Sequence, residues 1–292
     1  TMGGATGPRA PRRLRWLVAP ATLVVLVLLI VPLGMLFGLS FGKSMVGSLA
    51  FGSEVTLDNY VRVFSRAIYA ESIYRSVGLA AVAALIALVL GYPLAYVMAK
   101  TASPLRNNIL MVIVLSSLQL DLIVRVYGLM VLLGDNGLIN ATLIEWGVIE
   151  RPLPLMYNMF GIVVGLVQIG LPFMVLSLTA AIRSVDPSLE DAARSLGATR
   201  WQTIRKVVLP LTMPGTLAGL MLVFALSLSS YAVPTLMGGF KVMVLPIHIY
   251  QQIAESARFQ FGAALAVVLF VISVASVSAY QIAARRNARG WA

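Results

Sequence analysis

Residues 191–210 read DAARSLGATRWQTIRKVVLP, a charged and glycine-interrupted stretch that lies between two long apolar segments. Just before it, Asp186 and Pro187 are typical of a helix N-cap and a first-turn proline, because the carboxylate satisfies a free N–H and proline has none to satisfy. Gly197 is typical of the residue that follows the end of a helix. The first half of the stretch therefore predicts one short helix that ends at Gly197.

The second half predicts another short helix. Thr199 and Gln202 have the spacing of a capping box, and we expect Pro210 to break this helix at the membrane boundary. Ala192 and Ala193 leave little side-chain bulk, so another surface could approach the backbone there. From these residues alone the segment is either a docking surface or an amphipathic link that rests on lipid headgroups.

The composition is that of a membrane protein. The chain has 292 residues, of which 59% are hydrophobic and 11% charged, with a mean hydropathy of +0.91, whereas about a quarter of the residues in soluble domains are charged. The absence of cysteine excludes disulfides and cysteine-based zinc or redox sites. The single His248 has no second ligand nearby in the sequence, so we expect no metal site.

Six windows of about 20 apolar residues are long enough to cross a bilayer as helices. They cover residues 16–39, 73–99, 107–133, 158–182, 211–231 and 261–284. The expected fold is an all-α membrane protein with six transmembrane helices. The expected organisation is a basic N-terminal tail at 1–15, a membrane domain at 16–284 and a C-terminal tail at 285–292.

The basic residues are distributed unevenly between the two sides. Six spans put both termini on one side, and the segments on that side carry fourteen Lys or Arg residues against three acidic residues. The segments on the other side carry seven of each. Because cytoplasmic loops of membrane proteins are rich in Lys and Arg, both termini are predicted to be cytoplasmic. This topology accounts for the net charge of +11 without nucleic acid as a partner.

The third apolar window contains two charged residues, Asp121 and Arg125. A lone charge at the centre of a membrane helix costs about 2.5–3.5 kcal/mol on insertion scales, so such residues face a protein interior or a polar path. Spaced four residues apart, the two either neutralise each other or place Asp121 on a path for a cationic solute. Tyr127, Gln168 and Tyr231 are further candidates for this path.

Residues 191–210 resemble the EAA loop of ABC importer permeases, whose pattern is E-A-A, three residues, G, nine residues, I, any residue and L-P. The positions that match are Asp191, Ala192, Ala193, Gly197, Val207, Leu209 and Pro210, with aspartate in place of glutamate and valine in place of isoleucine. Two further stretches, QLDLIVRVYGLMVLLGDNGLIN (119–140) and LTMPGTLAGLMLVFALSLSSYAVPTLMGG (211–239), are similar to the permease pair of spermidine/putrescine importers. The LTMPG stretch is more similar to the first permease of that pair.

This resemblance implies a type I importer permease in a bacterial plasma membrane. Its loop, about 186–209, would dock on a separate ATPase subunit. The coupling residues implied are Glu190, Asp191, Ala192, Ala193, Leu196, Gly197, Ala198, Val207, Leu209 and Pro210. The implied partners are a homologous second permease, two ATPase subunits that bind ATP and Mg, and a soluble substrate-binding protein. This chain would have no ATPase site and no cofactor of its own.

The substrate that the resemblance favours is a polyamine, with opines, amino-acid-like compounds and phosphonates as other small solutes that related systems carry. A self-sufficient secondary transporter is the alternative from another class. Such transporters often contain paired, interrupted repeats, and we find no convincing repeat in this sequence. An integral membrane enzyme would need clustered His, Glu or Cys residues, and this chain has one His and no Cys.

Overall fold

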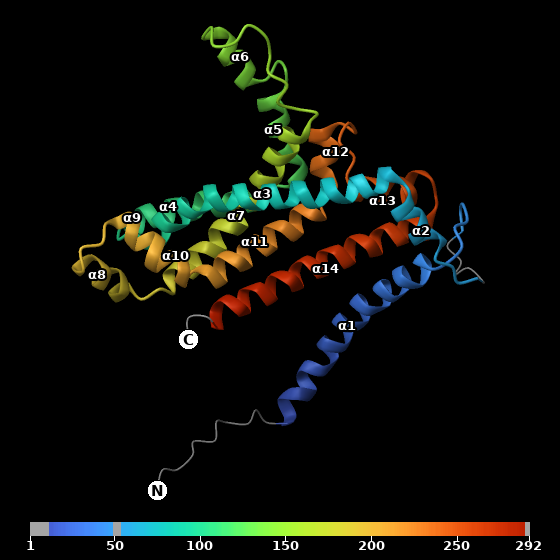
Figure 1. Cartoon of the computed structure of the whole chain (residues 1–292), viewed down its shortest axis with the longest axis horizontal. Coiled ribbons are helices and arrows are strands. Elements are labelled where there is room, and N and C mark those ends of the chain that lie inside the picture. The colour runs from blue at the N-terminus through green and yellow to red at the C-terminus, as the bar shows by residue number, and fades with distance from the viewer. Residues whose placement is uncertain (1–11, 49–53, 290–292) are drawn as a thin grey trace.

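A computed structural model describes residues 12–48 and 54–289, and its regular elements are helices (Figure 1). The longer helices are α1 (Arg12–Ser40), α3 (Ala67–Lys100), α4 (Pro104–Gln119), α5 (Leu122–Leu133), α7 (Met159–Arg183), α11 (Met213–Leu228) and α14 (Phe259–Arg289). Shorter helices connect them: α2 (Asp58–Ser65), α6 (Leu138–Glu145), α8 (Pro187–Ser195), α9 (Arg200–Thr203), α10 (Leu209–Leu211), α12 (Ala232–Gly238) and α13 (Leu245–Tyr250). Two π-helical turns, η1 (Ile204–Val208) and η2 (Gln251–Glu255), complete the set.

Five stretches of helix are long and apolar enough to cross a membrane, and a sixth passes as a bent pair. The five are Thr22–Ser40, Ala67–Lys100, Leu122–Glu145, Met159–Arg183 and Phe259–Ala279, and the pair is Arg200–Leu211 with Met213–Leu228. The prediction of an all-α membrane protein is confirmed. Of the predicted tails, residues 1–11 and 290–292 lie outside the described residues, while α1 begins at Arg12 and α14 runs to Arg289.

The long helices α3, α7, α11 and α14 run beside one another, as Figure 1 shows. At one end of this group lie α8 and α9, and at the other lie α2 and α13. We call these the α8 end and the α13 end. Helix α1 packs along part of α14 and diverges from it toward its own N-terminus. Helix α5 contacts α7 and α12, and α6 lies beyond it, away from the long helices.

Small residues allow the central helices to pack closely. The buried face of α3 carries Ala80, Ala83, Ala84 and Ala87. Farther along the same helix, a Cβ built on Gly91 would lie 3.2 Å from Cγ of Met174 in α7. Such small side chains let two helix backbones approach and gain contact along their length. The pair α3–α7, extended by α11, is therefore the core of the fold.

The third predicted span, 107–133, is wrong as a single helix. Helix α4 ends at Gln119, and α5 starts after Asp121, whose Oδ1 accepts a hydrogen bond from the Ile123 amide at 2.8 Å. A carboxylate in this position caps the free N–H groups of a new helix. The 16 residues of α4 measure about 24 Å along the helix axis, and the chain then turns into α5.

The expected break at Pro210 is also wrong. The chain stays helical through Pro210 because the wide π turn η1 precedes it, and the break comes at Thr212 instead. There the axis bends by 71° between Arg200–Leu211 and α11. Pro214 lies in the first turn of α11. Backbone N–H groups in the first turn make no hydrogen bond within the helix, so a proline there costs none.

Candidate coupling surface and substrate pathway

We use the name EAA segment for residues 186–212, which are the predicted loop together with the bend at Thr212. The segment starts with the helix that the sequence predicts. Asp186 Oδ1 accepts a hydrogen bond from the Ser188 amide at 2.9 Å, and this bond holds the pKa of Asp186 below its usual value. The Asp186 carboxylate therefore stays ionised at neutral pH, and its negative charge interacts favourably with the positive end of the α8 dipole. Helix α8 ends before Gly197, whose φ of +86° is in the left-handed region that suits glycine.

The second part of the EAA segment is capped reciprocally. The Thr199 amide donates to Gln202 Oε1 at 2.8 Å, and the Gln202 amide donates to Thr199 Oγ1 at 3.3 Å. This is the capping box that the sequence predicts. The segment is therefore two short helices joined by a left-handed turn, and its internal hydrogen bonds give it a defined shape.

The EAA segment presents uncovered apolar side chains at the α8 end. Leu196 is 89% exposed and Trp201 is 70% exposed. Asp191 and Ala192 are exposed beside them, while Ala193 and Ala198 are half-buried. An exposed leucine next to small alanines is unfavourable in water and suits a surface that another protein covers.

The remaining predicted coupling residues lie nearer to the membrane helices. Val207 and Pro210 are half-buried and Leu209 is partly exposed, all three on the η1–α10 stretch. Glu190 differs from the rest because it is only 5% exposed and points toward its own chain. Its Oε1 lies 2.6 Å from Lys100 Nζ, and its Oε2 accepts a hydrogen bond from the Tyr96 hydroxyl at 3.3 Å.

The five pathway candidates do not form one described pocket. Asp121 is exposed and caps α5, and Tyr127 on the same helix is 53% exposed. Arg125 has a buried Nε and Nη1, and Gln168 a buried Oε1, for which the described part of the chain supplies no hydrogen-bond partner. No ion pair joins Asp121 to Arg125 in the described structure, although the sequence allowed one.

Tyr231 has an aromatic partner that the sequence did not single out. Its ring stacks on that of Tyr250 with centroids 4.7 Å apart, between the start of α12 and the end of α13. The two residues are nineteen positions apart, so no local pattern could have paired them. The stacked pair places two aromatic faces near the α13 end of the molecule.

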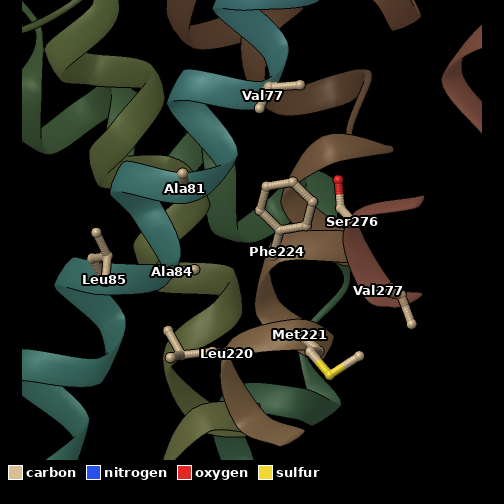
Figure 2. A pocket seen from close by; sticks show the side chains of 9 residues that line it. All are labelled: Val77, Ala81, Ala84, Leu85, Leu220, Met221, Phe224, Ser276 and Val277. Atoms are coloured by element: carbon tan, nitrogen blue, oxygen red, sulfur yellow. The ribbon is translucent and has the colours of Figure 1, made fainter. Parts of the chain in front are cut away.

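A cavity of about 360 Å³ lies between α3, α11 and α14. Figure 2 shows its lining, which is apolar except for Ser276 on α14 and includes Val77 and Leu85 on α3 and Phe224 on α11. A smaller cavity beside the α13 end is lined by three serines, Ser76, Ser227 and Ser230, among apolar residues. None of the five pathway candidates lines either cavity.

Residues 91–289 match the family described as the binding-protein-dependent transport system inner membrane component. The chain belongs to this family. The matched region contains the whole EAA segment, so the resemblance drawn from that stretch is confirmed. The chain is a multi-pass inner-membrane permease subunit of an ABC importer, a transport subunit and not an ATPase.

Relatives of this permease cover most of its length. The spermidine/putrescine transport system permease protein PotB of Haemophilus influenzae is 35% identical over 234 residues, which are 80% of this chain and 81% of that protein. PotB of Escherichia coli is 37% identical over 230 residues, 79% of this chain and 83% of that protein. A protein named "Probable molybdenum ABC transporter permease protein" from Haloferax volcanii is 34% identical over 200 residues, 68% and 69% of the two chains.

A solved structure has the same fold. The crystal structure of a bacterial ABC transporter involved in the import of the acidic polysaccharide alginate contains a chain that aligns with a TM-score of 0.76. The alignment covers 94% of this permease and 95% of that chain at 19% sequence identity. The expected type I importer architecture is confirmed.

Proposed function

We propose that this permease forms half of a translocation pathway for polyamines such as spermidine and putrescine. A soluble binding protein delivers the solute, a second homologous permease forms the other half, and two ATPase subunits drive the cycle. The proposal is supported by the relatives named as spermidine/putrescine permeases, which match about four fifths of the chain.

Docking of an ATPase subunit on the EAA segment rests on one observation, the exposed Leu196 at the turn between α8 and α9. Burying a leucine side chain stabilises a complex by about 1.5–3 kcal/mol. Trp201 and the small side chains of Ala192 and Ala193 extend this surface. ATP and Mg²⁺ would bind to the ATPase subunits, and this chain would contribute only the surface that receives their movement.

The α8 end would face the cytoplasm, together with both termini. Lys100 and Arg183 are the last residues of α3 and α7, Arg106 lies in the first turn of α4, and Arg194 lies in α8, so all four are at or near this end. The positive-inside rule places such clusters on the cytoplasmic side. The α13 end, with its stacked tyrosines, would then meet the binding protein.

The transport cycle would be a two-state switch. ATP binding brings the two ATPase subunits together, which moves the EAA segment of each permease and turns the pathway from inward-open to outward-open. Such rigid-body switching requires that nucleotide binding favours one of two existing arrangements. The 71° bend at Thr212 is the joint between the EAA segment and α11.

The pathway residues would serve a cationic solute in different ways. The exposed carboxylate of Asp121 would attract an ammonium group, and the rings of Tyr127 and Tyr231 would offer cation–π contacts. The Oε1 of Gln168 is an acceptor that has no hydrogen-bond partner in the described chain.

The side chain of Arg125 supports a second candidate substrate, a small solute that carries a negative charge. Its buried Nε and Nη1 have no hydrogen-bond partner in the described structure, and a guanidinium pairs well with anionic oxygens. This candidate is supported by the Haloferax volcanii relative, which is of similar identity and is named as a probable molybdenum transporter permease.

The test is uptake into proteoliposomes that contain this permease, its second permease and the ATPase, with binding protein outside. Labelled spermidine or putrescine should accumulate only with ATP in the lumen. Uptake by this chain alone, independent of ATP, would show a secondary transporter instead. A thermal-shift screen of the binding protein would decide between a polyamine and an anion, since only the true solute raises its melting temperature.

A further inference from the structure

Helix α3 carries Tyr92, Tyr96 and Lys100 at intervals of four residues. This spacing puts them in one row on the same face of the helix. The row leads to the α8 end of the molecule, where α3 finishes at Lys100. All three side chains contact the EAA segment, and we call them the α3 row.

Two members of the α3 row hold the start of the EAA segment. Lys100 Nζ lies 2.6 Å from Glu190 Oε1, and the Tyr96 hydroxyl donates to Glu190 Oε2 at 3.3 Å. Arg194 makes a longer contact with the same carboxylate, 3.9 Å from its Nη2 to Oε2. A carboxylate that is 5% exposed depends on these partners, because an isolated buried charge is strongly unfavourable.

The third member contacts the other end of the EAA segment. The Tyr92 hydroxyl lies 3.2 Å from Thr212 Oγ1, within hydrogen-bond distance. Thr212 is buried, and it is the residue at which the axis bends by 71° into α11. The α3 row therefore contacts both the helix that faces the ATPase and the joint that leads into the membrane.

Apart from the short chain connection to α7 through residues 184–186, helix α8 makes few contacts with the longer helices. It packs mainly against α9 and η1, which belong to the same segment. Helix α3, by contrast, forms the most extensive helix pair of the fold with α7 and also packs on α11. A displacement of α8 reaches this core through physical contacts, and the Glu190 contacts add a direct side-chain link from α8 to α3.

We propose that Lys100 and Tyr96, through Glu190, are positioning residues that carry the movement of α8 to the α3–α7 core. The inference rests on the proposed function of the EAA segment, and it assigns Glu190 to the permease side of the coupling and not to the ATPase contact. Tyr92 and Thr212 act at the joint, so that α8 and α11 move with α3 as one body.

The test compares Lys100→Gln with Arg106→Gln in the complete complex in proteoliposomes. Arg106 lies in the first turn of α4, and its Nε donates a hydrogen bond to Thr101 Oγ1 at 2.6 Å. Lys100→Gln should keep the ATPase bound and lower the stimulation of ATP hydrolysis by loaded binding protein about fivefold or more, the scale of a coupling free energy between two sites. Arg106→Gln should behave as the unmodified complex. Normal stimulation and normal solute transported per ATP in Lys100→Gln would overturn the proposal.

A double variant distinguishes loss of coupling from a folding defect caused by an unpaired buried charge. Lys100→Gln alone leaves Glu190 with a weaker partner, whereas Lys100→Gln with Glu190→Gln removes both charges and leaves no buried charge unpaired. The double variant should also assemble with low stimulation. Loss of the ATPase subunits from both variants would assign the pair to docking and overturn the proposal. If the unmodified chain fails to bind any ATPase, the proposed function itself fails, which is a different result.

Discussion

Asp121 caps the helix that carries Arg125 one turn later. The Asp121 side chain accepts a hydrogen bond from the Ile123 amide at 2.8 Å, and its carbonyl accepts one from the Arg125 amide at 3.1 Å. The two residues are linked through the backbone of α5, and their charged groups have separate surroundings. Each charge is therefore available to a group outside this pair.

Replacing Asp121 with asparagine separates its charge from its cap. Asparagine caps a helix about as well as aspartate, so Asp121→Asn should leave thermal stability unchanged, while Asp121→Ala should lose about 1 kcal/mol. If the carboxylate attracts the solute, Asp121→Asn should raise the KM for spermidine about tenfold, which corresponds to about 1.4 kcal/mol. Uptake by Asp121→Asn that equals that of the unmodified complex would limit Asp121 to capping.

Gly197 tests whether the turn of the EAA segment needs its backbone shape. At φ +86° a Cβ would meet no described atom within 4 Å beyond the neighbouring residues, so substitution strains only the backbone. Gly197→Ala should cost about 1–2 kcal/mol locally and reduce ATP-driven uptake, whereas Gly197→Asn should be milder because asparagine tolerates this region. A larger loss of uptake in Gly197→Asn than in Gly197→Ala would mean that side-chain size at the docking surface, and not backbone strain, causes the loss.

Close packing of α7 on α12 depends on Gly165. A Cβ on this residue would lie 2.7 Å from Val233 Cγ1. Gly165→Ala should destabilise the protein by about 1–3 kcal/mol through overpacking, measured as a lower melting temperature in detergent. Adding Val233→Ala should restore part of the loss. Gly78→Ala, at a site where a Cβ would have no described neighbour within 4 Å, is the control.

His248 gives the fold a dependence on pH. Burial lowers the pKa of His248, and a hydrogen bond with Gln251 opposes this in part. The pKa of His248 in the folded state lies below its value in the unfolded chain, about 6.5. Protonation of His248 therefore does not lower the free energy of unfolding above about pH 6.5, but lowers it as the pH falls from there toward the folded-state pKa. His248→Asn should make the melting temperature depend less on pH between pH 7 and 5. An unchanged slope would show that other groups control the acid sensitivity.

The capping residues of the EAA segment could be predicted because their signals are local. Asp186, Gly197 and the pair Thr199 and Gln202 each act within three residues of their hydrogen-bond partners, so the sequence alone indicated both short helices. The break at Asp121 was missed although aspartate before an apolar run is a helix-start signal. A hydropathy window averages over such a residue and predicts one continuous span.

The contacts that connect distant parts of the chain could not be predicted. The sequence places Glu190 among the coupling residues because it stands next to the motif, and only the fold shows that it turns toward Lys100, ninety positions away. The stacking of Tyr231 on Tyr250 likewise depends on how α12 and α13 fold back. Sequence patterns identify the helices, and side-chain pairing follows from their packing.

The most direct test of the coupling surface is co-purification of the ATPase subunits with Leu196→Asp. Leu196 is 89% exposed, so the change should not disturb the permease itself. Leu105→Asp, at a leucine that is 71% exposed near the start of α4, is the matched control. We predict that Leu196→Asp loses the ATPase and ATP-driven uptake while Leu105→Asp retains both. Retention of the ATPase and of uptake by Leu196→Asp would contradict the assignment of the EAA segment as the docking surface.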